Sequence, residues 1–270
     1  MLLINSLFLY SYSVDILNIP FDRGANKIGS KHAYNFLKDN INNLDNLNIN
    51  NVYHIECENE KVQNILHNGY LTSYNILNNN NFPLLIGGDH TTAISNIFAS
   101  NDYCIENNYS LGVLWFDAHA DFNTIETSSS GNIHGVPVAI LCGHTLKELQ
   151  YGNILSPSQF IYYGIRDIDS LEFNRFRDYN MAVMYNLNDL RKFINKYDKI
   201  HLSFDLDCLD PSIMSCVNTK VKNGIDMKSM RKKLEYIKYS NKLIGMDLVE
   251  YNPLLGNNAN VIEEILNSVF

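Results

Sequence analysis

The sequence predicts an α/β fold with a parallel β-sheet that carries helices on both faces. Short apolar runs rich in β-branched residues recur along the 270 residues, and stretches with helical spacing of apolar residues lie between several of them. Strands that alternate with helices are typical of such sheets. Because 46% of the residues are hydrophobic and neither a long linker nor an internal repeat interrupts the chain, we expect a single domain over residues 1–270.

Eight apolar runs are the predicted strands, and about eight strands fit one domain. In chain order they cover residues 14–19, 52–55, 83–86, 111–116, 160–164, 182–185, 199–204 and 243–249. Apolar residues at helical spacing predict helices over residues 61–77 and 227–237, and residues 261–269 are also helix-like. Three asparagine-rich tracts, 40–51, 78–81 and 257–260, predict turns and loops.

The bulk properties argue against several kinds of partner. The net charge of −8 does not suit a nucleic-acid or anionic-membrane surface, which needs clustered Lys and Arg. Residues 1–13 are apolar, but they lack the basic segment and cleavage site of a signal peptide and are too short to span a bilayer. We interpret them as the lead-in to the first strand. Five scattered cysteines without a Cys-X-X-Cys pair predict free thiols in a reducing compartment, the cytoplasm.

Two acidic segments directly follow predicted strands. Asp117, His119 and Asp121 follow the run 111–116, and Asp205 and Asp207 follow the run 199–204. Alternate residues of a strand share one face, so we expect each set to project together. Four carboxylates buried together would be very costly without a cation between them. The segments therefore predict a site for one or two metal ions.

His90 is a sixth candidate ligand. It follows the run 83–86 and the turn Gly87-Gly88, just past a strand end, where open α/β sheets place their ligand crevice. A lone histidine is usually packed or hydrogen-bonded, and a single Asp-X-Asp segment more often caps a helix, but three such segments at strand ends favour metal. An oxygen-rich set with imidazoles suits Mn²⁺ and leaves Fe²⁺, Co²⁺ and Ni²⁺ as alternatives. Cys208 is out of phase with Asp205 and Asp207 on a strand, so we do not expect it to bind metal.

Five segments resemble the ureohydrolase family, the binuclear manganese enzymes that include arginase and agmatinase, and the resemblance is strongest to the arginase members. The segments are GGDH at 87–90, WFDAHADFN at 115–123, SGNIHG at 130–135, SFDLDCLDPS at 203–212 and MDLVEYNP at 246–253. They occur in the family's order and approximate spacing. The resemblance implies a three-layer α/β/α sandwich around an eight-stranded parallel sheet, two Mn²⁺ per subunit, and a homo-oligomer that is a trimer or hexamer.

The resemblance also implies roles at the reacting centre. His90, Asp117, Asp121 and Asp205 bind or share one ion, His119 and Asp207 complete the other, and Asp121 counts among the catalytic residues with His134 and Glu250. Two ions about 3.5–4 Å apart can hold one water and lower its pKa. Glu250 would pair with a guanidinium group, and His134 would move a proton to the leaving amine. The plainer alternatives are a solvated carboxylate and a histidine bound to loop backbone.

The same resemblance implies contacts to the substrate. Asn123, Ser128 and Ser130 match positions that bind the α-carboxylate of L-arginine, Asp169 and Glu172 match positions near the α-amino group, and Thr219 matches a hydroxyl near the guanidinium. Any one of these polar residues taken alone is about as often a partner in loop hydrogen bonds as a substrate contact. Together they favour a hydrolase of linear amidines that converts L-arginine to L-ornithine and urea.

Two alternatives remain open. The substrate is instead agmatine, a guanidino acid or formiminoglutamate, or the chain is a catalytically weak regulatory homologue. The latter draws on one departure from the family pattern, which has Gly-Thr-Pro and then Gly-Gly where this chain has Asn218-Thr219-Lys220 and then Asn223-Gly224. This departure concerns the geometry of the loop 213–224 more than metal binding.

Overall fold

Eight parallel strands form one sheet in the computed structural model, which describes residues 13–270. The order across the sheet is β2-β1-β3-β8-β7-β4-β5-β6. The strands are β1 Ser13–Ile19, β2 Asn48–His54, β3 Phe82–Gly87, β4 Leu111–Phe116, β5 Phe160–Tyr163, β6 Ala182–Val183, β7 Lys199–Asp205 and β8 Leu243–Val249. The sheet confirms the predicted fold class, and each predicted strand is present with ends shifted by a few residues.

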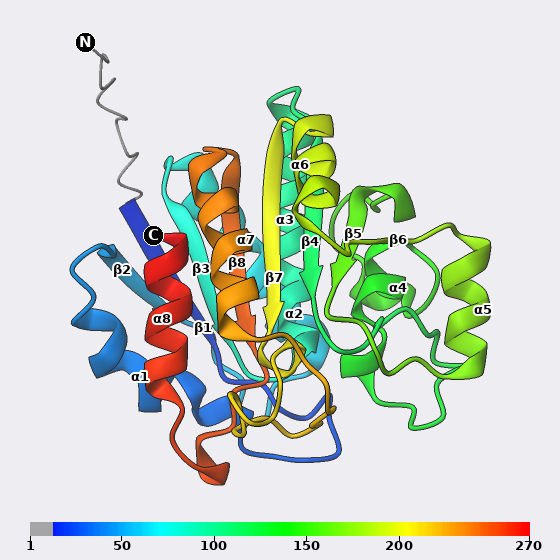
Figure 1. The fold of residues 1–270 in the computed structure, drawn as a ribbon, viewed down its shortest axis with the longest axis horizontal. Coiled ribbons are helices and arrows are strands. Elements are labelled where there is room, and N and C mark those ends of the chain that lie inside the picture. The colour runs from blue at the N-terminus through cyan, green and yellow to red at the C-terminus, as the bar shows by residue number, and fades with distance from the viewer. Residues whose placement is uncertain (1–12) are drawn as a thin grey trace.

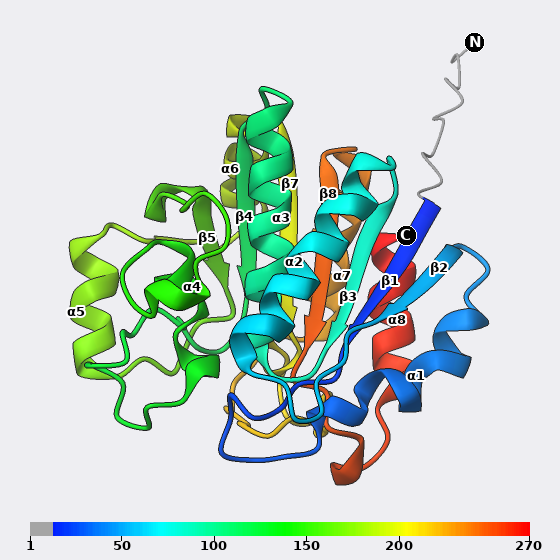
Figure 2. The same cartoon turned by 180° about the vertical axis from the view of Figure 1, so that it is seen from behind.

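Helices cover both faces of the sheet (Figures 1 and 2). One face carries α1 Ala33–Asn42, α6 Leu187–Lys196, α7 Met227–Tyr239 and α8 Ala259–Val269, and the other carries α2 Val62–Asn78, α3 Ala93–Glu106 and α4 Pro137–Leu141. Helix α5, Ser170–Asp178, lies beside the edge formed by β5 and β6. No helix within residues 13–270 is long and apolar enough to cross a membrane. The interpretation of the N-terminal lead-in falls largely outside the described residues.

Alternating strand residues supply a separate apolar core to each face. On β4, Leu114 and Phe116 pack into the core under α6 and α7, whereas Val113 and Trp115 pack into the core under α3 and α4. All four side chains are fully buried. Near-continuous apolar strands are what a parallel sheet covered on both faces requires.

The asparagine tract at 40–51 forms the expected turn only in its middle, at residues 43–47. Helix α1 continues to Asn42 and strand β2 begins at Asn48. Leu37 and Ile41 of α1 are buried against the sheet, and this packing outweighs the turn preference of asparagine. Strand β2 is an edge strand with mostly exposed side chains, so its asparagines face solvent at little cost.

The metal-ligand segments do not continue as strands, so the alternation argument for them is wrong. Strand β4 ends at Phe116, and Asp121 adopts a left-handed backbone with φ of 49°. Strand β7 ends at Asp205, whose side chain accepts a hydrogen bond from the Asp207 amide and caps the 3₁₀ turn Leu206–Cys208. The carboxylates are therefore gathered by tight turns after the strand ends. The phase argument about Cys208 fails for the same reason.

The ends of four neighbouring strands position these turns. Strands β3, β8, β7 and β4 are adjacent in the sheet and finish at the same edge, at the bottom of Figure 1. At this edge Gly88 fits between two strand ends, because its amide donates to Ile19 O at 3.1 Å and its carbonyl accepts from the Glu250 amide at 2.8 Å. Gly88 thus fixes where the chain turns toward His90 and Glu250.

Gly88→Ala should destabilise the protein by about 1–3 kcal/mol, the usual range for overpacking. A Cβ at this position would lie 1.8 Å from the Phe21 carbonyl oxygen, a backbone atom that cannot move alone. Urea unfolding of the purified protein measures the change. Gly135→Ala is the matched control, because a Cβ there meets nothing within 4 Å. Equal stability of the two variants would contradict the packing argument.

Candidate metal centre and substrate cavity

The first acidic cluster surrounds His90. The Nδ1 atom of His90 lies 3.0 Å from Asp117 Oδ2 and 3.2 Å from both Asp121 Oδ2 and Asp205 Oδ2. His90 is 1% exposed, and its Nδ1 satisfies no hydrogen-bond geometry. The other ring nitrogen, Nε2, is 3.0 Å from Ser203 Oγ. A buried nitrogen aimed at three carboxylate oxygens is an arrangement that a divalent ion would satisfy.

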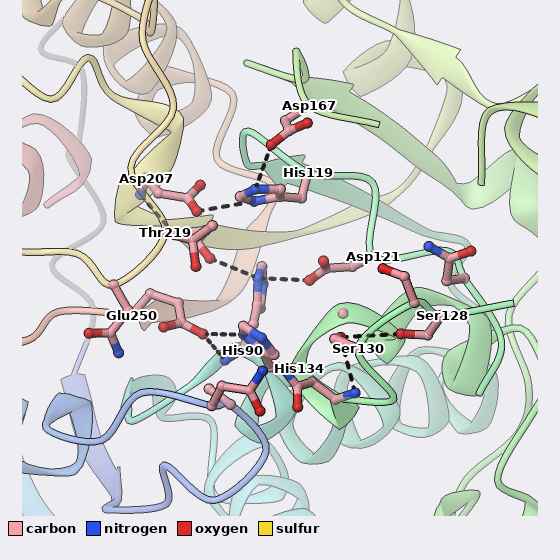
Figure 3. Close-up of a pocket in the computed structure, with 18 of the residues that line it drawn as sticks. His90, His119, Asp121, Ser128, Ser130, His134, Asp167, Asp207, Thr219 and Glu250 are labelled. Atoms are coloured by element: carbon pink, nitrogen blue, oxygen red, sulfur yellow. Dashed lines mark hydrogen bonds and ion pairs between the residues drawn. The ribbon is translucent and has the colours of Figure 1, made fainter. Parts of the chain in front are cut away.

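The second cluster surrounds His119 and shares one residue with the first. His119 Nδ1 lies 3.1 Å from Asp207 Oδ2 and 3.3 Å from Asp117 Oδ1. Asp117 therefore turns one carboxylate oxygen toward each cluster. Both groups, His90 with Asp117 and Asp205, and His119 with Asp117 and Asp207, have the spacing that could hold a metal ion. In Figure 3, dashed lines join His119 to Asp207 and His90 to Asp121.

The pKa directions show that the buried carboxylates oppose one another's ionisation. Burial raises the pKa of Asp205, and the charges of Asp207 and Asp117 raise it further. Burial followed by the Asp117 charge likewise raises the pKa of Asp121. Burial raises the pKa of Asp117 too, but its close contacts with the rings of His119 and His90 outweigh burial and lower it overall. Asp117 thus stays ionised, and its charge opposes ionisation of the others unless a metal ion compensates.

Three residues outside the predicted set hold these ligands in place. The Trp115 ring stacks on the His90 ring with centroids 4.2 Å apart, and its Nε1 donates to Asp117 Oδ2 at 3.0 Å. Arg166 donates to the backbone oxygens of residues in both the 206–209 turn and the 213–224 loop, including Asp207 O at 2.7 Å. Sequence reasoning missed Trp115, Arg166 and Ser203 as supporting residues, although Trp115 and Ser203 stand in quoted segments.

A cavity of about 360 Å³ opens beside the clusters. Every predicted site residue except Asp117 lines it: His90, His119, Asp121, Asn123, Ser128, Ser130, His134, Asp169, Glu172, Asp205, Asp207, Thr219 and Glu250. Asp117 is 1% exposed and lies behind the wall. The loop around Lys27, together with Asp167 and Asn218, also lines the cavity, and no sequence pattern pointed to Lys27 or Asn218.

Glu250 and His134 face each other across one part of the cavity (Figure 3). His134 Nδ1 is 3.1 Å from Glu250 Oε1, which also accepts the His90 amide at 3.0 Å. Burial lowers the pKa of His134, but its hydrogen bond to Glu250 outweighs burial and raises it. Glu250 has φ of 66°, so two cavity carboxylates, Asp121 and Glu250, sit in the left-handed region. Such strained residues are frequent at functional sites.

Asn123, Asp169 and Glu172 form an ordered polar network on another part of the cavity wall. Asn123 Nδ2 donates to Asp169 Oδ2 at 2.8 Å, and Asp169 Oδ1 caps α5 by accepting the Leu171 and Glu172 amides. Glu172 Oε1 accepts the Phe122 amide at 2.8 Å. Burial raises the pKa of Glu172 to about 7. These contacts fix the carboxylates before any ligand arrives.

The hydroxyls of the 128–130 segment are more open. Ser128 Oγ accepts the Gly131 amide at 3.1 Å, and Ser130 Oγ accepts the Asn132 amide at 3.3 Å. Both serines are partly or fully exposed. The two hydroxyl oxygens lie 3.4 Å apart, so one hydroxyl can donate to the other while the second keeps its hydrogen for a ligand.

Comparison with known proteins places this geometry in a family. The model of the arginase family matches residues 12–269. The arginase of Staphylococcus aureus is 36% identical over 209 residues, which are 72% of this chain and 68% of that protein. The solved structure of Entamoeba histolytica arginase in complex with L-ornithine superposes with a TM-score of 0.87 at 28% identity, covering 96% of this chain and 98% of that one. Bacillus cereus arginase superposes with a TM-score of 0.86 at 26% identity, covering 96% and 98%.

The fold and the acidic clusters therefore define a hydrolase with candidate metal-ligand groups at the carboxyl ends of a parallel sheet. The chain belongs to the arginase family. This family membership confirms the resemblance seen in the sequence.

The raised pKa of Glu172 predicts a pH-dependent stability. The folded chain keeps a proton up to about pH 7, whereas the unfolded chain releases it near the ordinary value of 4.5. The stabilising contribution of this protonated carboxyl is complete below pH 4.5 and is lost as the pH rises to 7. Glu172→Gln should therefore gain stability relative to the wild type across this window, on the order of 2–3 kcal/mol at pH 8.

Thermal and urea unfolding at pH 4.5, 6 and 8 measure this difference. Glu126→Gln is the control, because Glu126 is exposed and a hydrogen bond to Thr124 lowers its pKa. That variant should not show the rise. A wild-type and Glu172→Gln difference that is constant with pH would mean that folding does not shift the pKa of Glu172.

Proposed function

We propose that the protein hydrolyses the guanidinium group of L-arginine to L-ornithine and urea, with two Mn²⁺ ions per chain. The observation that carries this proposal is the placement of Glu250, whose carboxylate lines the same cavity as the two clusters and lies 3.1 Å from His134. A carboxylate facing that space can pair with a guanidinium group through two parallel hydrogen bonds.

The donor set favours manganese. Two imidazoles and four carboxylates are too oxygen-rich for a structural zinc site and suit a higher-coordinate ion. His90, Asp117, Asp121 and Asp205 would hold one ion, and His119, Asp207 and Asp117 the other. When bound, the metal pair supplies a water that is ionised at neutral pH.

The protein side chains then orient the substrate and move protons. Glu250 already accepts the His90 amide and contacts His134, so it presents a fixed oxygen to the guanidinium carbon's amino groups. A fixed partner of this kind lowers the cost of reaching the reactive geometry. The His134 imidazole, with its pKa raised by Glu250, donates a proton to the leaving nitrogen and so helps ornithine depart.

The polar residues around Asn123 and Asp169 bind the amino-acid part of the substrate. Asn123, Ser128 and Ser130 donate hydrogen bonds to the α-carboxylate, and Asp169 and Glu172 attract the α-ammonium. The Thr219 hydroxyl lies on the wall near Glu250. An arginine zwitterion with a guanidinium tail matches this order of charges, and agmatine lacks the carboxylate.

We also propose that the protein is a cytoplasmic homo-oligomer, a trimer or hexamer. The family resemblance supports the assembly, and five buried free cysteines suit a reducing compartment. Sedimentation velocity of the purified chain would measure its mass in solution.

A urea-release assay with added Mn²⁺ tests the proposal across arginine, agmatine, 4-guanidinobutyrate and formiminoglutamate, with formamide release measured for the last. We expect kcat/KM to favour arginine over agmatine by about 10³-fold or more, because a site built to bind a polar group rejects the analogue that lacks it. Agmatine turnover equal to that of arginine would contradict the proposed specificity and favour the alternative substrate class.

Ser130→Ala should lower kcat/KM for arginine. The loss, expressed as a free energy, should be on the order of 1.5–3 kcal/mol, which is typical of one hydrogen bond to a charged group. The kcat/KM for agmatine should stay within about twofold of the wild-type value, since agmatine has no carboxylate for Ser130 to contact. Ser156→Ala is the control, because Ser156 caps a 3₁₀ turn elsewhere and does not line the cavity. Equal losses on both substrates would remove Ser130 from carboxylate recognition.

Asp205→Ala should reduce bound manganese to at most one ion per chain and abolish urea release, since it removes a ligand from the His90 cluster. Elemental analysis after dialysis against Mn²⁺ gives the stoichiometry. Asp198→Ala is the matched control, an exposed acid beside the opposite end of β7. Wild-type protein that retains only trace divalent metal would overturn the metal assignment.

A further inference from the structure

Three loops meet at one wall of the cavity, and Asn252 lies at their junction. The loops are 24–29 after β1, 213–224 after β7 and 250–255 after β8. The Asn252 side chain is 2% exposed, and its Nδ2 donates to Ile28 O at 3.0 Å and to Asn218 Oδ1 at 2.7 Å. Its Oδ1 accepts the Leu254 amide at 3.0 Å. One buried amide therefore bonds to all three loops.

Asn218 completes the junction from the middle loop. Its Nδ2 donates to Lys27 O at 3.1 Å, and its backbone oxygen accepts Lys27 Nζ at 2.7 Å. With the bond to Asn252, both polar atoms of the Asn218 amide have partners, and the residue is 7% exposed. Lys27 is 191 positions away in sequence, so these contacts close a long-range connection.

Asn218 stands where the family pattern has glycine, which has no side chain to make these bonds. Its neighbour Thr219 lines the cavity, and so do Lys27 and Asn218. The 213–224 loop departs from the family pattern, but it is still bonded to its neighbouring loops. The side-chain amide supplies two connections, one to the 24–29 loop and one to the loop that follows Glu250.

We propose that Asn218 is a positioning residue that locks these three loops together and holds the Thr219 side of the cavity ready for substrate. Its effect on catalysis rests on the proposed function, whereas its effect on the loops does not. A wall that is ordered in advance spares the substrate the entropy of ordering it on binding. Loss of the lock should therefore appear in KM more than in kcat, because no atom of Asn218 takes part in bond cleavage.

Hydrogen–deuterium exchange of the Mn²⁺-treated protein tests the lock directly. In Asn218→Ala, backbone amides of both 24–29 and 213–224 should exchange about tenfold faster than in the wild type. This is the change expected when the opening free energy falls by the net contribution of one hydrogen bond. Asn218→Asp keeps the acceptor for Asn252 and loses the donor to Lys27 O, so its rates should fall between. Asn107→Ala is the control, because this exposed asparagine follows α3 at the opposite, amino end of the parallel strands, where its side chain donates to Tyr103 O at 2.8 Å.

Kinetics on the same variants give the second readout. Asn218→Ala should raise KM for arginine about tenfold and leave kcat within about threefold, with Asn218→Asp between and unchanged manganese content in both. Faster exchange in 213–224 alone, or a fall in kcat with unchanged KM, would overturn the proposal. If the wild type releases no urea from any of the four compounds, the proposed function fails, while the exchange pattern still decides whether Asn218 locks the loops.

Discussion

Asp117 is the constraint on which the site depends, because one buried carboxylate divides its two oxygens between two clusters. Oδ2 faces His90 and Oδ1 faces His119. Both histidines contact this carboxylate, and the Trp115 indole fixes its orientation through a hydrogen bond of 3.0 Å. The pair Trp115 and Asp117 thus connects the sheet core to the candidate metal-ligand groups, since Trp115 is fully buried under α3 and α4.

The order of the strands explains why such a cluster can form at all. Ligands that follow β3, β4 and β7, and the carboxylate that follows β8, are far apart in sequence, but these four strands are neighbours in the sheet. Their carboxyl ends converge on one cavity, as open α/β sheets favour. Burial there makes isolated carboxylates costly, so the same geometry that gathers the acids also demands a counter-charge. The far side of the cavity, around Asp169 and Glu172, is held by helix capping and backbone amides, which need no ion.

Much of this was predictable from local sequence, and the remainder depends on contacts that local sequence does not contain. The strands follow from the apolar runs. The six candidate ligands follow from the Asp and His residues that come soon after three of these runs. The turns after β4 and β7 were not predictable by alternation, because the left-handed Asp121 and the 3₁₀ turn at Leu206 replace strand geometry. The asparagine tract at 40–51 forms a turn only at 43–47, because the packing of Leu37 and Ile41 extends helix α1 into the tract. The Lys27–Asn218 contact joins residues 191 positions apart and leaves no local signal.

Electron paramagnetic resonance of the protein loaded with two equivalents of Mn²⁺ tests the shared role of Asp117 most directly. Two ions that share one carboxylate are close enough to couple their spins. The account predicts the spectrum of a coupled pair in the wild type and the simple six-line pattern of isolated ions in Asp117→Ala. A wild-type spectrum of isolated ions, at a confirmed stoichiometry of two per chain, would contradict a binuclear centre built on Asp117.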